Sequence, residues 1–231
     1  DSEAAATARA YNNANNVVAI YPGGFLPIIA TEIEDLKLAG GIKGEIAGWT
    51  ADVQLAYGSN DLQYGLFNTL NATFGDQSQR TFNAGGLFYD QLLAGLDLAR
   101  PYDLGLAGRL NVAVGLEYRK EGFEITPGEP ASYSDGGRRP GAAPVSQGFG
   151  GFRPSNAIDV TRDSVGAYID LEGDLVEGLT VGLAGRYESY SDFGDTVNGK
   201  VSARYEFTPD LAIRGTASTG FKAPALQQQF F

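Results

Sequence analysis

The sequence predicts an all-β protein, an antiparallel transmembrane β-barrel, from three observations. The first is the alternation of apolar and polar side chains along residues 180–188, which gives a strand one apolar face and one wet face. The second is length, because such runs exceed the roughly five or six residues of a typical globular strand. The third is the loop pattern, in which very short turns and long loops alternate along the chain.

The first part of the chain is interpreted as a loop followed by one hairpin. Residues 1–27 are expected to form a loop, since prolines flank a glycine pair at residues 22–27. Residues 28–38 are expected to form a poorly patterned strand and residues 39–44 a glycine-rich turn. Residues 49–57 give a clearer strand, because Trp49, Val53 and Tyr57 alternate with polar side chains. Residues 58–84 are interpreted as irregular and rich in asparagine.

The next two hairpins are better patterned. Residues 92–98 alternate until a tight turn preset by Pro101, and their partner strand is expected over residues 108–125. The longest loop, residues 126–161, follows with several prolines and many glycines. Residues 165–172 and 180–188 then form a hairpin around the turn at residues 176–178.

The last hairpin joins residues 200–207 to residues 211–218 through Pro209, after a shorter loop at residues 191–198. The sequence therefore predicts about eight strands in four hairpins over residues 28–220, with residues 221–231 beginning the next loop. Antiparallel order requires the short turns to lie at one end and residues 126–161 at the other. In outer-membrane barrels the short turns lie in the periplasm and the long loops lie outside.

Composition excludes several classes of function. With no Cys and no His, the chain lacks the groups that serve Ser-His-Asp triads and most zinc sites. The net charge of -11 opposes nucleic-acid binding, because phosphate backbones are met by Lys and Arg. We therefore expect no enzyme activity, no cofactor, no metal site and no nucleic-acid partner. Asp192, Asp195 and Glu188 lack EF-hand spacing and are interpreted as turn-capping residues.

The alternation of apolar and polar residues does not by itself distinguish a membrane barrel from a soluble β-sandwich, because both folds give the same sequence pattern. The barrel is favoured by strands of about ten residues or more, which suit a tilted bilayer crossing, and by aromatic side chains toward the strand ends, which suit interfacial girdles. These aromatic residues are Tyr57, Tyr118, Phe123, Tyr187, Tyr190, Tyr205 and Phe207. A soluble all-β binding or structural domain is the alternative.

Several stretches resemble motifs of TonB-dependent outer-membrane receptors. Residues 187–194 (YESYSDFG) and 213–226 (IRGTASTGFKAPAL) are similar to the RYExYSDFG and LRGxxSxGFRAPSL stretches of that family. Residues 110–121 (LNVAVGLEYRKE) are similar to its LNxAxGxEYRxE strand. The resemblance extends from about Tyr21 onward in the same order, with Lys222 in place of the usual Arg and Ala225 in place of the usual Ser.

The resemblance implies a barrel of about 22 strands with a plugged lumen, located in the bacterial cell outer membrane. Such a receptor imports a scarce ligand, for example a siderophore, vitamin, oligosaccharide or peptide. The implied partners are the lipid bilayer of the outer membrane, the protein's own plug domain, TonB acting through the plug and its TonB box, and a small imported ligand. A passive porin is the other transport alternative.

On this interpretation, residues 1–231 are part of the barrel domain, an open fragment with the plug domain absent. Both terminal strands are then expected to present unpaired backbone edges. The segment is therefore expected neither to close on itself nor to transport alone.

Candidate ligand contacts lie in the longest loop, because aromatic and arginine side chains can grip sugars, peptides or anionic chelates. They are Tyr133, Arg138, Arg139, Phe152 and Arg153. A solvated loop is the simpler alternative. The charged residues on the inferred lumen face mix both signs, so ion pairs and plug contacts explain them more simply than ligand binding. These are Asp97, Glu117, Arg119, Asp170, Glu172, Arg186, Glu188, Lys200, Arg204, Glu206 and Arg214.

Overall fold

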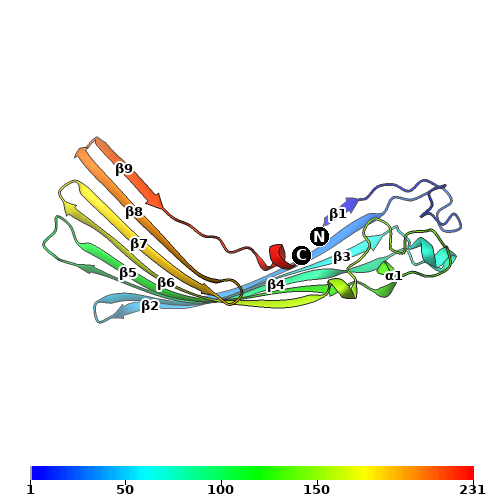
Figure 1. Ribbon diagram of the computed structural model, residues 1–231, viewed down its shortest axis with the longest axis horizontal. Coiled ribbons are helices and arrows are strands. Elements are labelled where there is room, and N and C mark those ends of the chain that lie inside the picture. The colour runs from blue at the N-terminus through cyan, green and yellow to red at the C-terminus, as the bar shows by residue number, and fades with distance from the viewer. Residues whose placement is uncertain (1) are drawn as a thin grey trace.

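A computed structural model describes residues 2–231 as one open, curved antiparallel sheet (Figure 1). Nine strands follow one another across the sheet in chain order. They are β1 (Ser2–Ala5), β2 (Ile28–Ile46), β3 (Trp49–Phe67), β4 (Phe82–Tyr102), β5 (Leu110–Pro127), β6 (Ile158–Val176), β7 (Leu179–Tyr190), β8 (Gly194–Thr208) and β9 (Leu211–Ser218). Three short helical turns lie in the connections between strands, η1 (Ala72–Gln77), α1 (Pro130–Tyr133) and η2 (Pro154–Asn156), and a fourth, α2 (Leu226–Phe230), follows β9.

The short turns and the long loops lie at opposite ends of the sheet, as predicted. The four hairpin turns are at residues 47–48, 103–109, 177–178 and 209–210, and they gather at the left of Figure 1. The longest connections are at residues 6–27, 68–81 and 128–157, and they gather at the right. The first turn is a two-residue one, and both Ala47 (φ 51°) and Gly48 (φ 78°) have positive φ, as a tight turn that follows strand twist requires.

Two predictions about the first hairpins were wrong. The expected turn at residues 39–44 lies inside β2, which pairs without interruption with β3 from Ile28 to Ile46. The expected irregular segment at residues 58–84 is mostly strand, because β3 continues to Phe67 and β4 begins at Phe82. Cross-strand hydrogen bonds therefore hold extended chain even where glycine or polar residues break the alternation.

Three smaller predictions also need correction. Residues 1–27 are not all loop, since Ser2–Ala5 pairs with Ile28–Thr31 as β1. The loop between β7 and β8 covers only residues 191–193, because β8 already begins at Gly194. Residues 221–231 include the short helix α2. The strands are thus longer, and the loops shorter, than the sequence pattern predicts.

The register places the apolar side chains on one face and the charged side chains on the other, as predicted. One row of directly paired residues on the apolar face contains Ile42, Val53, Leu96, Leu116, Ala167, Tyr187 and Val197. Arg186 and Glu117 lie on the opposite face, and the described residues form one sheet with no second sheet against it. A closed two-sheet core, the soluble alternative, is therefore not formed.

The apolar face forms a band bounded by aromatic side chains. Tyr57, Tyr118 and Tyr187 are the last residues on this face before it becomes polar toward the long loops, whereas Trp49 and Tyr205 lie near the hairpin turns. On β2 the band runs from Leu36 to Ile46, which is ten residue steps. At about 3.4 Å per residue and a tilt of about 45° this is about 24 Å in height, close to the roughly 25 Å band of outer-membrane barrels.

Two of the aromatic residues predicted for this girdle lie elsewhere. Phe123 and Tyr190 are on the polar face, and Phe123 is buried against the C-terminal part of the chain. Both residues lie near strand ends, as the sequence predicts, but the strand register places their side chains on the polar face. Phe123 clusters with Ile125 and Leu226, and Tyr190 stacks on Phe193, so neither belongs to the aromatic girdle of the apolar face.

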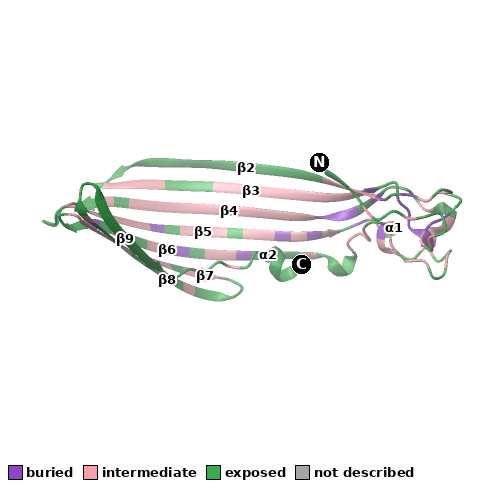
Figure 2. Ribbon diagram, turned by 90° about the horizontal axis from the view of Figure 1, so that it is seen from above, coloured by how far each residue is buried: buried purple, intermediate pink, exposed green. Residues whose placement is uncertain are grey.

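Both long edges of the sheet are open. β9 pairs only with β8, and beyond Thr31 the outer edge of β2 has no partner strand among the described residues. Figure 2 accordingly shows β2 and β9 as exposed, while buried residues gather mainly at the end with the long loops. No helix within residues 2–231 is long and apolar enough to span a membrane. The expectation of an open, curved sheet is confirmed.

Candidate functional site

The polar face carries a network of ion pairs in the middle of the sheet. Arg186 contacts Glu188 at 2.9 Å and Glu117 at 3.4 Å, and Arg119 contacts Glu117 at 2.9 Å. Arg204 pairs with Glu206 at 2.9 Å. These contacts agree with the simpler interpretation of the mixed charges, in which they pair with one another across a wet surface.

Glycines on the polar face let long side chains reach across it. Gly166 lies between Glu117 and Glu188 in the register, and a Cβ there would come within 3.1 Å of the Arg186 guanidinium. Gly115 likewise makes room for Tyr168, whose hydroxyl donates a hydrogen bond to Asp97. The spacing of these glycines therefore permits contacts between side chains on strands that are not neighbours.

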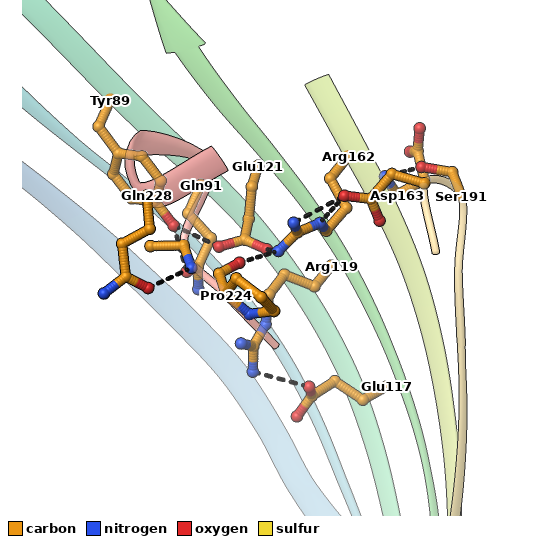
Figure 3. A network of polar contacts seen from close by, with 12 residues as sticks. Tyr89, Gln91, Glu117, Arg119, Glu121, Arg162, Asp163, Ser191, Pro224 and Gln228 are labelled. Carbon is orange, nitrogen blue, oxygen red and sulfur yellow. Dashed lines mark hydrogen bonds and ion pairs between the residues drawn. The ribbon is translucent and has the colours of Figure 1, made fainter. Parts of the chain in front are cut away.

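A second network surrounds Arg162, which is 1% exposed (Figure 3). Its Nε and Nη2 donate to Asp192 Oδ2 at 2.8 and 2.7 Å, and its Nη1 donates to the carbonyl oxygen of Pro224 at 2.8 Å. Glu121 Oε2 lies 3.8 Å from Nη1, and Tyr89 donates its hydroxyl to Glu121 at 2.6 Å. One buried guanidinium thus joins β5, β6, the turn after β7 and residues beyond β9.

An aromatic surface lies where the polar face meets the long loops. Tyr64 of β3 packs against Phe149 and Phe152 with ring centroids 5.4 and 5.9 Å apart, and Phe149 and Phe152 are 5.3 Å apart. Phe231 joins them at 6.2 Å from Phe152. We call these four side chains the aromatic surface. Rings of this kind offer apolar contact area with favourable edge-to-face geometry.

The long loops form a packed cap, defined as residues 6–27, 68–81 and 128–157. Buried Asn71 holds it together, because its Nδ2 donates to the carbonyls of Ala131 and Ser134 while its Oδ1 accepts from Thr73. Tyr21 packs in the same cap beneath Arg80, which lies 5.6 Å from its ring. Burial raises the pKa of the Tyr21 phenol, and the nearby Arg80 charge opposes this. The cap is therefore an ordered structure with its own small core.

The structure divides the five predicted ligand contacts into two groups. Phe152 belongs to the aromatic surface, and Arg153 follows it with an exposed side chain. Tyr133 ends α1 in the cap, Arg138 lies beside Gly75, and Arg139 donates to the carbonyl of Asn16. Phe152 and Arg153 are therefore together at the aromatic surface, while the other three lie elsewhere in the cap.

Sequence reasoning missed Arg162 and gave Asp192 a different role. Asp192 is interpreted from the sequence as a turn-capping residue, but its carboxylate accepts both hydrogen bonds from Arg162, 30 residues earlier. No local motif joins these two residues. The available signal was that Arg162 falls on the polar face by alternation, ahead of a strand that was expected to begin only at Val165.

The geometry of the sheet agrees with a comparison to known families. A family described as "TonB dependent receptor-like, beta-barrel" matches residues 6–231. The chain belongs to this family. Proteins of this family are receptors of the bacterial outer membrane, in which a plug domain and TonB take part in general.

One solved structure is similar to this sheet. It is the siderophore receptor PirA from Pseudomonas aeruginosa, with 14% sequence identity and a TM-score of 0.46. The alignment covers 88% of this chain and 37% of PirA, so this chain spans little more than a third of that receptor's length. No curated protein matches the chain.

Proposed function

We propose that this chain forms part of the barrel wall of a TonB-dependent transporter that imports a scarce ligand across the outer membrane. The observation that carries the proposal is the division of one sheet into a lipid-facing apolar band and a charged face. That charged face ends, on the loop side, in the aromatic surface. The ligand class is a siderophore, vitamin, oligosaccharide or peptide.

The polar face suits contact with a plug domain of the same receptor. Besides its ion pairs, it holds Lys200 and Arg214, which make no ion pair within 4.0 Å among residues 2–231. Charged side chains that face a polar partner in a wet interior keep their hydration or gain hydrogen bonds. We propose that the plug covers this face and transmits the action of TonB.

We propose that the ligand binds at the loop side, against the aromatic surface and Arg153. The exposed Arg153 guanidinium makes no hydrogen bond or ion pair with the described residues, so its donors are free for a ligand oxygen. Tyr133, Arg138 and Arg139 remain proposed contacts from the cap side. Because the cap is packed, these residues would meet a ligand only on its outer surface.

Energy dependence separates active import from a passive porin. Cells carrying the intact receptor would be given an iron-loaded hydroxamate, cobalamin, a maltodextrin and an oligopeptide, each radiolabelled, with and without a proton uncoupler. We expect uptake of one probe to disappear with the uncoupler and in cells without TonB. Uptake that persists under both conditions would instead support the porin.

Replacing Arg153 tests the location of the site within the same assay. We expect Arg153→Gln to raise the half-saturating probe concentration about tenfold, since a hydrogen bond to a charged group is worth about 1.5–3 kcal/mol. The matched control is Arg109→Gln, which removes the same charge from an exposed position in the turn at the opposite end. Equal behaviour of the two variants would move the site away from Arg153.

A further inference from the structure

The chain beyond β9 crosses the polar face as an extended segment. We call residues 219–231 the strap. Figure 1 shows it running from the end of β9 back over the concave face to α2, which lies above the middle of the sheet. The strap forms no strand. Its first residue, Thr219, still exchanges hydrogen bonds with Gly199 of β8, and beyond Thr219 the contacts with the wall are made by a few side chains and one carbonyl group.

Beyond Thr219, the strap contacts the wall at four points along its length. Phe221 packs on Phe193 with ring centroids 5.4 Å apart, and the Pro224 carbonyl accepts a hydrogen bond from Arg162. Leu226 is buried, with 1% of its surface exposed. Phe231 packs on Phe152. Leu226 enters a pocket on the polar face that contains both apolar and aromatic side chains. Leu226 forms a buried cluster there with Phe123 and Ile125, and the side chains that pack against this cluster are Leu87, Tyr89, Phe152, Ile158 and Val160.

Arg162 is the group that joins these points. Its guanidinium lies 5.4 Å from the ring of Phe193, which itself stacks on Tyr190 at 4.3 Å and supports Phe221. The same guanidinium neutralises Asp192 and faces Glu121, while it binds the Pro224 carbonyl. Two donors of the planar guanidinium converge on Asp192 Oδ2 while a third donates to the Pro224 carbonyl, a fixed arrangement that a lysine ammonium cannot reproduce.

Removal of this cation would leave oxygen atoms facing one another. Asp192, Glu121 and the Pro224 carbonyl all direct oxygen toward the space that the Arg162 guanidinium fills. Without it, two carboxylates and a carbonyl dipole repel each other in a partly buried place. Glu121 lies in a strand and Asp192 in a three-residue turn between two paired strands, whereas the strap forms no strand. The strap is therefore the part that is held least and that moves away.

We propose that Arg162 is a positioning residue, which holds the strap so that Phe231 completes the aromatic surface for ligand. This rests on the proposed function, since the aromatic surface is the ligand site there. Arg162 does not contact the ligand itself. It acts through Pro224 and Leu226, which set where Phe231 meets Phe152.

A nitroxide on Gln228→Cys reports the strap directly. Gln228 is exposed in α2, and this chain contains no cysteine, so the label is unique within it. The receptor would be studied at full length in lipid nanodiscs, with cysteines outside this chain replaced by serine. We expect a broad, immobile spectrum for the parent and a narrow, mobile component as the major one in Arg162→Gln.

Two further variants separate strap release from misfolding. Leu226→Ala weakens the docking from the strap side and leaves the sheet intact, so it should also give a mobile spectrum. Arg204→Gln removes the same charge from an exposed ion pair on the same face, near the turns, and should leave the spectrum immobile. Immobile spectra in both Arg162→Gln and Leu226→Ala would overturn the proposal.

The second measurement is uptake, in cells that carry each variant, of the probe that cells with the parent receptor accumulate most. We expect Arg162→Gln and Leu226→Ala to raise the half-saturating concentration about tenfold, the factor that about 1.4 kcal/mol of lost aromatic contact would give. A mobile strap with unchanged half-saturation would overturn its role in the ligand site. Parent cells that accumulate no probe would contradict the proposed function, while the spectra would still decide whether Arg162 holds the strap.

Discussion

The position of a side chain on the polar face depends on how much space the residue opposite it on the next strand leaves. Tyr168 reaches Asp97 only because Gly115 stands between them in the register. A Cβ at Gly115 would lie 2.1 Å from the Tyr168 ring and 2.7 Å from Asp97 Oδ1. Here glycine is required by close approach and not by backbone conformation.

Gly115→Ala is therefore expected to destabilise the wall. The methyl group must displace Tyr168 from Asp97, and overpacking of this kind costs about 1–3 kcal/mol. The measurement is denaturant unfolding of the full-length receptor in detergent. Gly215→Ala is the matched control, because a Cβ at Gly215 meets nothing within 4 Å. If both variants unfold at the same denaturant concentration, the contact between Tyr168 and Asp97 contributes nothing measurable.

At the scale of the strand, the alternation of apolar and polar side chains marks only the part of a strand that lies in the apolar band. On β3 the apolar side chains of Trp49, Val53 and Tyr57 are followed on the same face by Ser59 and Asp61. The strand continues to Phe67, but beyond Tyr57 this face is polar, and the apolar side chains of Leu62, Tyr64 and Leu66 lie on the other face. The sequence pattern therefore predicts the membrane band well and loses the strand where it leaves the band.

The band makes a graded prediction for added charge. Val53→Arg places a cation halfway between Trp49 and Tyr57, where a lipid-facing arginine costs about 2–4 kcal/mol. Ser59→Arg places the same charge on the same face of the same strand, just beyond Tyr57, where the cost falls to about 0–1 kcal/mol. Folding of the receptor into lipid vesicles, followed by urea titration, measures both. Equal costs at the two positions would contradict the assignment of the band.

Part of β2 could not be predicted from the sequence for a different reason. Residues 39–44 of β2 contain three glycines, which favour turns in isolation, yet they pair residue by residue with β3. Gly41 lies so close to the Val53 carbonyl that a Cβ would be 2.7 Å from it. Such long-range pairing decides the structure here, and no single stretch of sequence contains that information.

The candidate site was only partly visible from the sequence. Phe152 and Arg153 could be chosen because aromatic and arginine residues stand together in one loop. The aromatic surface also needs Tyr64 and Phe231, which are far away in sequence and reach Phe152 only through the order of the strands and the course of the strap. The contact between Arg162 and Asp192 is of the same kind.

At the scale of the whole molecule, a single sheet separates an apolar face from a charged face. Its loop end carries the cap and the aromatic surface, and its turn end carries four short connections. In an outer-membrane barrel the first end faces the outside and the second faces the periplasm. Transport direction, ligand access and contact with TonB all depend on this orientation.

Labelling of intact cells with a membrane-impermeant maleimide tests this orientation most directly. Single cysteines would be placed in the full-length receptor at Asp135 in the cap and at Asp103 in the turn after β4, both exposed. We expect Asp135→Cys to react in intact cells, and Asp103→Cys to react only after the outer membrane is permeabilised. Rapid labelling of Asp103→Cys in intact cells, with protection of Asp135→Cys, would contradict the account.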